Sequence, residues 1–132
     1  MTASSAGPTI VPTIRYTDGR AAIEFLRAAF GFATGPVTEG EDGAVVHAEL
    51  TYADGVVMVA SRSGTDSPFD TGRVCTYLVT ETPDALHDQA LAAGAEIVMG
   101  LVDQDYGSRE FAARDPEGNV WCFGTYRPAP SA

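Results

Sequence analysis

Hydrophobic residues in the first half of the chain change from a strand pattern to a helical pattern and back. Residues 9–16 are rich in β-branched side chains and predict a strand. In residues 19–30 the apolar side chains recur at helical spacing, with Asp18 placed to cap the helix and Gly31 to end it. Three more strands are predicted, at residues 32–40, 44–52 and 56–62.

The second half of the chain repeats this order of elements. A strand is predicted at 73–80, and Thr82-Pro83 begins a helix over 84–93 that Gly94 ends. Three strands are predicted to follow, at residues 96–102, 109–115 and 119–126. When the sequence is aligned with itself so that Gly31 falls on Gly94, Asp54-Gly55 falls on Glu117-Gly118 and Val59 falls on Cys122. The chain therefore contains two copies of one unit.

The repeat predicts an α+β fold of two tandem βαβββ modules that form a curved mixed sheet with a concave cleft. The modules are expected at 9–62 and 73–126, joined by a linker of turn-forming residues at 63–72. A short lead-in, 1–8, and a tail, 127–132, flank them. Because one helix covers only one face of a sheet, the other face is left for a partner or a ligand.

Composition narrows the classes of function. The formal net charge is −10 and every basic residue is an arginine, so no lysine is present to form a Schiff base. The excess of acidic residues argues against binding to nucleic acid, because phosphate groups need a basic surface. No apolar run is long enough for a membrane helix. The N-terminus lacks the features of a secretory signal, which favours a cytoplasmic protein with free thiols at its two cysteines.

Several segments resemble a known family. The motif DPEGN at 115–119 closes the second unit, and residues 16–32 and 82–98 look like the family's two helices. Residues 106–121, YGSREFAARDPEGNVW, are similar to the last hairpin of its bleomycin-resistance-like and PhnB-like branches. Over nearly the whole chain the sequence resembles the glyoxalase/bleomycin-resistance/dioxygenase superfamily, also called the vicinal oxygen chelate fold. The resemblance implies that fold and a ligand cleft.

The resemblance also implies where a metal would be bound. Enzymes of the family hold a divalent metal through His and Glu at four strand positions, which fall here on Val11, Val59, Val74 or Cys75, and Cys122. None of these is His, Asp or Glu, so we expect no metal and no other cofactor. Two alternatives remain for the thiols: Cys75, Cys122 and His47 can form a zinc site, or the cysteines are small buried hydrophobes.

Other side chains are candidates for contacts with a ligand. His47 and Glu49 share one face of their strand with Val45, and that face is turned either to solvent or to the cleft. Arg15 either binds an anion or pairs with an acid at the rim. Trp121 is expected in the core, which leaves the tyrosines as cleft aromatics. The expected ligand-binding residues are Arg15, His47, Glu49, Val59, Cys75, Tyr77, Tyr106 and Cys122.

Three hypotheses for the function follow. The first, which the residues favour, is a protein that binds a small molecule in the cleft without a metal, as the bleomycin-resistance branch does. The expected ligand is apolar or aromatic, and a cationic ligand is also compatible with the residues. The second is a divalent-metal-dependent lyase, isomerase or dioxygenase of the same superfamily, and the third is a structural module. No nucleic-acid or membrane partner is expected, but a homodimer is, because open sheet edges need covering.

Overall fold

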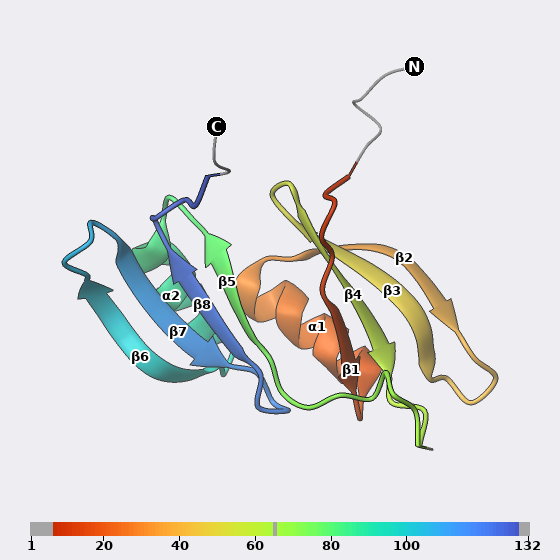
Figure 1. The fold of residues 1–132 in the computed structure, drawn as a ribbon. Helices are drawn as coiled ribbons and strands as arrows, with labels where there is room; N and C mark the ends of the chain where they lie inside the picture. Colours follow the sequence, from red (N-terminus) through yellow and green to blue (C-terminus); the bar gives the residue numbers. More distant parts are fainter. Residues whose placement is uncertain (1–6, 65, 130–132) are drawn as a thin grey trace. The chain divides into compact units, whose positions relative to one another are not determined.

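Each half of the chain folds as a strand, a helix and three further strands (Figure 1). The computed structural model describes residues 7–64 and 66–129, so residues 1–6 of the expected lead-in and 130–132 of the expected tail lie outside it. The chain divides into two compact units, Met1–Gly72 and Arg73–Ala132. The first unit contains β1 (Thr13–Tyr16), α1 (Gly19–Phe30), β2 (Ala33–Glu39), β3 (Val45–Tyr52) and β4 (Gly55–Ser61).

The second unit repeats this topology. It contains β5 (Cys75–Val79), α2 (Pro83–Ala92), β6 (Glu96–Asp103), β7 (Arg109–Arg114) and β8 (Val120–Gly124). Each unit has its own four-stranded mixed sheet, in the orders β1-β4-β3-β2 and β5-β8-β7-β6. The outer pairs β1–β4 and β5–β8 are parallel and the remaining pairs are antiparallel. The predicted α+β fold of two βαβββ units is therefore confirmed.

Helix α1 begins and ends where its sequence predicts. The side chain of Asp18 accepts a hydrogen bond from the backbone N–H of Ala21 at 3.0 Å, and Gly31 ends the helix with a φ of 81°. The helix packs on the first sheet, with its closest contacts on β4. Its apolar face and the sheet residues beneath it form a buried core of Ile14, Tyr16, Leu26, Phe30, Ala48, Leu50, Val57 and Val59.

Helix α2 covers the second sheet in the same way. It starts at Pro83, which needs no hydrogen-bond partner for its nitrogen in the first turn, and it packs on β6 and β7. Trp121 and Phe123 of β8 are both fully buried, as is Phe111 of β7, which stacks on Phe123. In each unit no described helix of that unit covers the opposite face of the sheet. None of the described helices has the length and apolarity needed to span a membrane.

The DPEGN motif forms the loop between β7 and β8, and Asp115 organises it. One carboxylate oxygen of Asp115 accepts hydrogen bonds from the backbone N–H groups of Glu117 and Asn119, each at 3.0 Å. The other accepts from the indole N–H of Trp121 at 3.1 Å. Asp115 is 4% exposed, so this carboxylate joins the loop to the buried core of the second unit.

Candidate ligand-binding site

The face of the first sheet opposite α1 carries part-exposed side chains. In the β1–β4 register Thr13 pairs with Met58 and Arg15 pairs with Ala60, and all four alternate with buried core residues. Paired residues on neighbouring strands point to the same face of a sheet. The uncovered face is therefore built from Thr13 and Arg15 on β1, Met58 and Ala60 on β4, and the polar residues of β3.

A cavity of about 250 Å³ lies on this uncovered face. Apolar groups make up most of its wall, and Arg15 and His47 supply polar groups at its edge. The loop that follows β4 contributes one aromatic ring, Phe69. The lining residues are Thr13, Ile14, Arg15, Val46, His47, Met58, Val59, Ala60 and Phe69.

Arg15 holds Phe69 and Asp70, in the loop after β4, against the first sheet. The guanidinium of Arg15 donates to Asp70 at 2.9 Å and lies 5.6 Å from the centre of the Phe69 ring. Burial raises the pKa of Asp70, but hydrogen bonds from Ser63 and the charge of Arg15 outweigh it and hold the pKa below its usual value. Of the two roles expected for Arg15, pairing with an acid is the one observed, so its charge is neutralised inside the protein.

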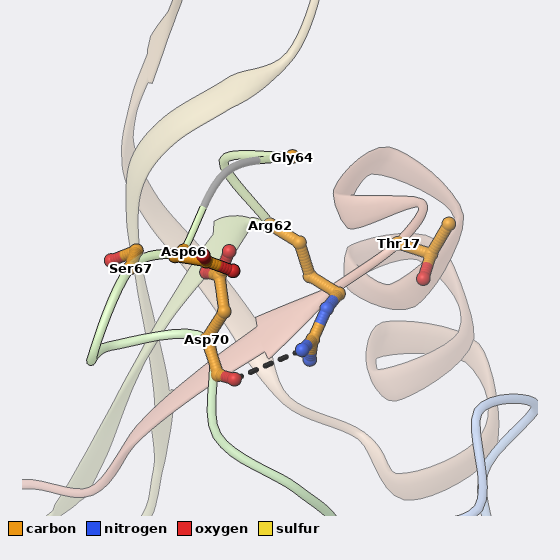
Figure 2. Close-up of a pocket in the computed structure, with 6 residues that line it drawn as sticks. All are labelled: Thr17, Arg62, Gly64, Asp66, Ser67 and Asp70. Carbon is orange, nitrogen blue, oxygen red and sulfur yellow. Dashed lines mark hydrogen bonds between the residues drawn. The ribbon is translucent and has the colours of Figure 1, made fainter.

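A second arginine, Arg62 at the end of β4, also holds this loop. Figure 2 shows Arg62 turned toward Asp70, whose backbone carbonyl accepts a hydrogen bond from the guanidinium at 2.9 Å. The Arg62 side chain also donates to the carbonyl of Thr71 at 2.9 Å. These groups border a polar hollow of about 460 Å³ lined by Thr17, Arg62, Gly64, Asp66, Ser67 and Asp70. Asp70 and Thr71 are thus bonded to the end of β4, and the first compact unit extends to Gly72.

His47 and Glu49 form a pair on the uncovered face. The Nε2 atom of His47 lies 3.0 Å from a carboxylate oxygen of Glu49, and both side chains are a little under half exposed. His47 also lines the cavity, so its partly exposed ring is accessible to a molecule in it. Val45 does not share that face as expected. It is 1% exposed, because the β2–β3 register shifts between Thr38 and Glu39.

Val59 lies on a different face from the one that the sequence predicts. It borders the cavity but is 1% exposed, and it pairs with Ile14 on the side of the sheet covered by α1. In the second unit Thr76 pairs with Trp121 in the same way, so the residue equivalent to Cys122 is Ala60. The parallel strands of the two units are thus one residue out of step with the alignment that places Gly31 on Gly94, and that alignment misplaces them. Val11 precedes β1.

The uncovered face of the second sheet carries the remaining expected residues. Tyr77 pairs with Cys122 and Cys75 pairs with Val120, so the two cysteines and Tyr77 share this face. Cys75 is exposed, Cys122 is partly exposed, and both are free thiols. Tyr106 precedes β7 and donates its hydroxyl proton to both carboxylate oxygens of Glu110 at 2.8 Å.

The Cys122 thiol and the Tyr106 hydroxyl on this second face have raised pKa values. Burial, together with the nearby charge of Glu110, raises the pKa of the Cys122 thiol to about 11. The hydrogen bond to Glu110 and burial raise the pKa of Tyr106 to about 12. With no cation bound beside it, Cys122 is therefore a neutral thiol at neutral pH.

The donor groups present do not fit a divalent metal of the kind that the family resemblance implies. On the uncovered faces the first and last strands of each unit present Thr13, Arg15, Met58, Ala60, Cys75, Tyr77 and Cys122. Hard divalent cations prefer carboxylate, carbonyl and imidazole ligands, and these positions offer none. His47 and Glu49 supply two such groups, but within residues 7–64 and 66–129 no set of three His, Cys, Asp or Glu side chains is placed to hold a metal.

The sequence did not reveal three residues that shape these faces. Phe69 lies among turn-forming residues, and only its aromatic character within a polar loop set it apart. Met58 was missed because the alignment of the two units placed the last strand one residue out of register. Glu110 could have been found from the alternation in β7, which places Glu110 and Ala112 on the face that carries Cys122.

Comparison with known proteins identifies the family. A sequence model described as the glyoxalase/bleomycin resistance protein/dioxygenase superfamily matches residues 9–123. The chain belongs to this superfamily. Within the superfamily it is similar to the uncharacterized protein Mb0911c of Mycobacterium bovis, with 30% identity over 125 residues that cover 89% of this chain and 82% of the relative.

Solved structures share the superfamily fold. TioX from Micromonospora sp. ML1 is 30% identical, with a TM-score of 0.76 over 89% of this chain and 98% of TioX. A mutant of glyoxalase I from Zea mays has a TM-score of 0.71 at 17% identity, over 91% of this chain and 46% of the maize chain. The maize likeness shows the fold alone.

Proposed function

We propose that the protein binds a small, largely apolar or aromatic molecule on the uncovered face of its first sheet, without a metal. The observation that carries the proposal is the cavity of about 250 Å³ between this face and Phe69. Concave sites with mostly apolar walls and a few polar groups are the usual form of organic-ligand sites. The fold of the superfamily leaves this face free of helices, which supports the same assignment.

The charges around the cavity favour a neutral ligand. Arg15 is neutralised by Asp70, and His47 is bonded to Glu49, so neither offers an unsatisfied charge to an anion. Val46, Met58, Ala60 and Phe69 supply apolar contacts, and the Phe69 ring is 67% exposed and free to stack on an aromatic molecule. In this proposal Arg15, His47 and Glu49 orient polar groups of the ligand.

The superfamily includes both binding proteins and enzymes, and binding is the better supported role. A divalent-metal lyase, isomerase or dioxygenase is the alternative, but the donor groups on the uncovered faces do not suit its metal. Binding of the bleomycin-resistance type needs a cavity and no reactive group. On the uncovered face of the second sheet, Cys75, Tyr77, Tyr106 and Cys122 are proposed as contacts for a small molecule bound by that unit.

Filling the cavity tests the proposal. The neutral aromatic probe 2-naphthol is expected to bind the parent protein, and Ala60→Phe is expected to weaken it by about tenfold or more, because the new ring occupies the cavity. Thr51→Phe is the matched control. Thr51 lies on β3 and does not line the cavity, so the affinity of this variant for 2-naphthol is expected to stay within about twofold of the parent. Ligand-detected NMR measures both.

Unfolding curves of the two variants show whether each remains folded. If folded Ala60→Phe protein binds 2-naphthol as tightly as the parent, the ligand does not occupy the cavity. No binding to the parent at millimolar probe concentration would count against a neutral aromatic ligand.

We also propose that the chain forms a homodimer. The edge strands β2 and β6 have unpaired backbone groups on one side and carry the exposed apolar residues Val37, Val98 and Val102. Such edges are usually covered in a stable protein. Light scattering at micromolar concentration is expected to give twice the mass of the chain. A monomer mass across that range would exclude the dimer.

A further inference from the structure

Glu110 is a buried carboxylate outside the cavity of the first unit. It lies on β7 and is 5% exposed. The β7–β8 register pairs Glu110 with Gly124 and Ala112 with Cys122, so the carboxylate belongs to the uncovered face of the second sheet. A carboxylate taken out of water is costly unless charge or hydrogen bonds compensate it.

Within the described residues, the groups that donate hydrogen bonds to the Glu110 carboxylate are neutral. The Tyr106 hydroxyl shares its one proton between the two carboxylate oxygens at 2.8 Å, and the amide of Gln104 donates to one oxygen at 3.3 Å. In the part of the chain that the structure describes, no arginine or histidine forms an ion pair with Glu110. The negative charge thus lacks an opposite charge.

Tyr106, which contacts this carboxylate, lies in a group of tyrosines. Tyr106 meets Tyr126 edge to face, with ring centres 6.2 Å apart, and the Tyr77 hydroxyl donates to the Tyr126 carbonyl at 2.6 Å. Gly124 allows these groups to approach, because a Cβ there would lie 2.6 Å from both Glu110 Cγ and Tyr77 Oη. Tyr106 is 57% exposed and covers the carboxylate from the solvent side.

An unpaired carboxylate beside aromatic rings recognises organic cations. An ammonium group gains a charge-assisted hydrogen bond from the carboxylate and a cation–π interaction from the rings. An anion would be repelled by Glu110, and a neutral molecule would leave its charge uncompensated. The arrangement therefore selects for positive charge.

We propose that Glu110, with the rings of Tyr106 and Tyr126, is a subsite for an organic ammonium group, which donates to Glu110 in place of the Tyr106 hydroxyl. The inference rests on the proposed binding of small molecules. It specifies that the group bound by the second unit is positively charged. It does not depend on the cavity of the first unit, since all the residues that form the subsite lie after Gly72.

Two probes of similar shape test the charge requirement. Benzylamine is a cation at pH 7 and benzyl alcohol is neutral, so calorimetry on the intact protein should show benzylamine binding at least about tenfold more tightly. Amide NMR shifts caused by benzylamine should concentrate in residues 104–110 and 122–126. Equal affinity for the two probes, or shifts confined to the first unit, would overturn the proposal.

Three variants test the residues. Glu110→Gln is expected to weaken benzylamine binding by about tenfold, whereas Glu81→Gln, an exposed carboxylate before α2, removes the same charge and should change it by less than about twofold. Tyr106→Phe removes the competing hydroxyl and should tighten benzylamine binding by about threefold. If Glu110 had only a structural role, Glu110→Gln and Glu81→Gln would change benzylamine affinity equally. Tyr106→Phe would then weaken benzylamine binding.

The outcomes separate this inference from the general proposal. Suppose that Ala60→Phe weakens 2-naphthol binding while Glu110→Gln and Glu81→Gln have equal affinity for benzylamine. The proposed ligand cavity in the first unit would then be supported, and the proposed ammonium subsite would be refuted. If Glu110→Gln does not fold, the comparison of the two probes and the NMR shifts of the parent protein still decide the matter.

Discussion

Replacing Asp115 with alanine is expected to lower the free energy of unfolding by about 3 kcal/mol, because several buried donors lose their acceptor together. The carboxylate accepts from two backbone N–H groups of its own loop and from the indole of Trp121, all within 3.1 Å. Trp121 is fully buried, so its N–H has no access to water as a substitute. Equilibrium unfolding in urea measures the loss.

The first unit offers a matched control. Asp54 stands in the turn between β3 and β4 and is exposed, so Asp54→Ala should change the free energy of unfolding by no more than about 0.5 kcal/mol. Asp115→Asn keeps one acceptor oxygen and should give an intermediate loss. An Asp115→Ala protein as stable as Asp54→Ala would show that the loop does not depend on this carboxylate.

Gly124→Ala is the second substitution with a large expected effect, a loss of about 2 kcal/mol in the free energy of unfolding. The added methyl group would lie 2.6 Å from Glu110 Cγ and from Tyr77 Oη, and 2.9 Å from Ser108 Oγ. Glu110 and Ser108 are buried and the tyrosine ring is rigid, so the crowding is relieved only by moving packed groups.

Gly100→Ala is the control for this substitution. Gly100 also lies in a strand, β6, but no atom outside its neighbours comes within 4 Å of the position that a Cβ would take. Alanine there should leave stability unchanged or raise it slightly, because the unfolded chain becomes less flexible. Thermal and urea unfolding should therefore show a clearly lower stability for Gly124→Ala than for Gly100→Ala. Equal stabilities would mean that the side chains around Glu110 can move to accommodate the methyl group without loss of stability.

Much of the fold could be predicted because it depends on local signals. The cap at Asp18, the left-handed Gly31 and the proline that starts α2 each act over a few residues. The alternation in β8 correctly placed Trp121 in the core and Cys122 on the other face. Spacing along one strand is enough to fix such alternation.

The site was predicted less well because its residues meet through long-range pairing. Arg15 and Asp70 are far apart in sequence, and no local pattern links them. The true equivalence of Ala60 and Cys122 depends on the strand register, which the alignment of the two helix ends does not fix. The alternation in β7 assigns Glu110 to its face, but its burial and its contact with Tyr106 are set by the folded chain.

The contacts that Arg15 and Arg62 make with Phe69, Asp70 and Thr71 determine what an exchange of units between two chains would carry with it. These contacts tie the three residues to β1 and to the end of β4, and the boundary between the two units follows them, after Gly72. If two copies traded their second units at this boundary, each cavity of the first unit would still be built from a single chain. Ligand binding there would therefore survive a change of oligomeric partner, and the effect of Ala60→Phe would be the same in exchanged and unexchanged forms.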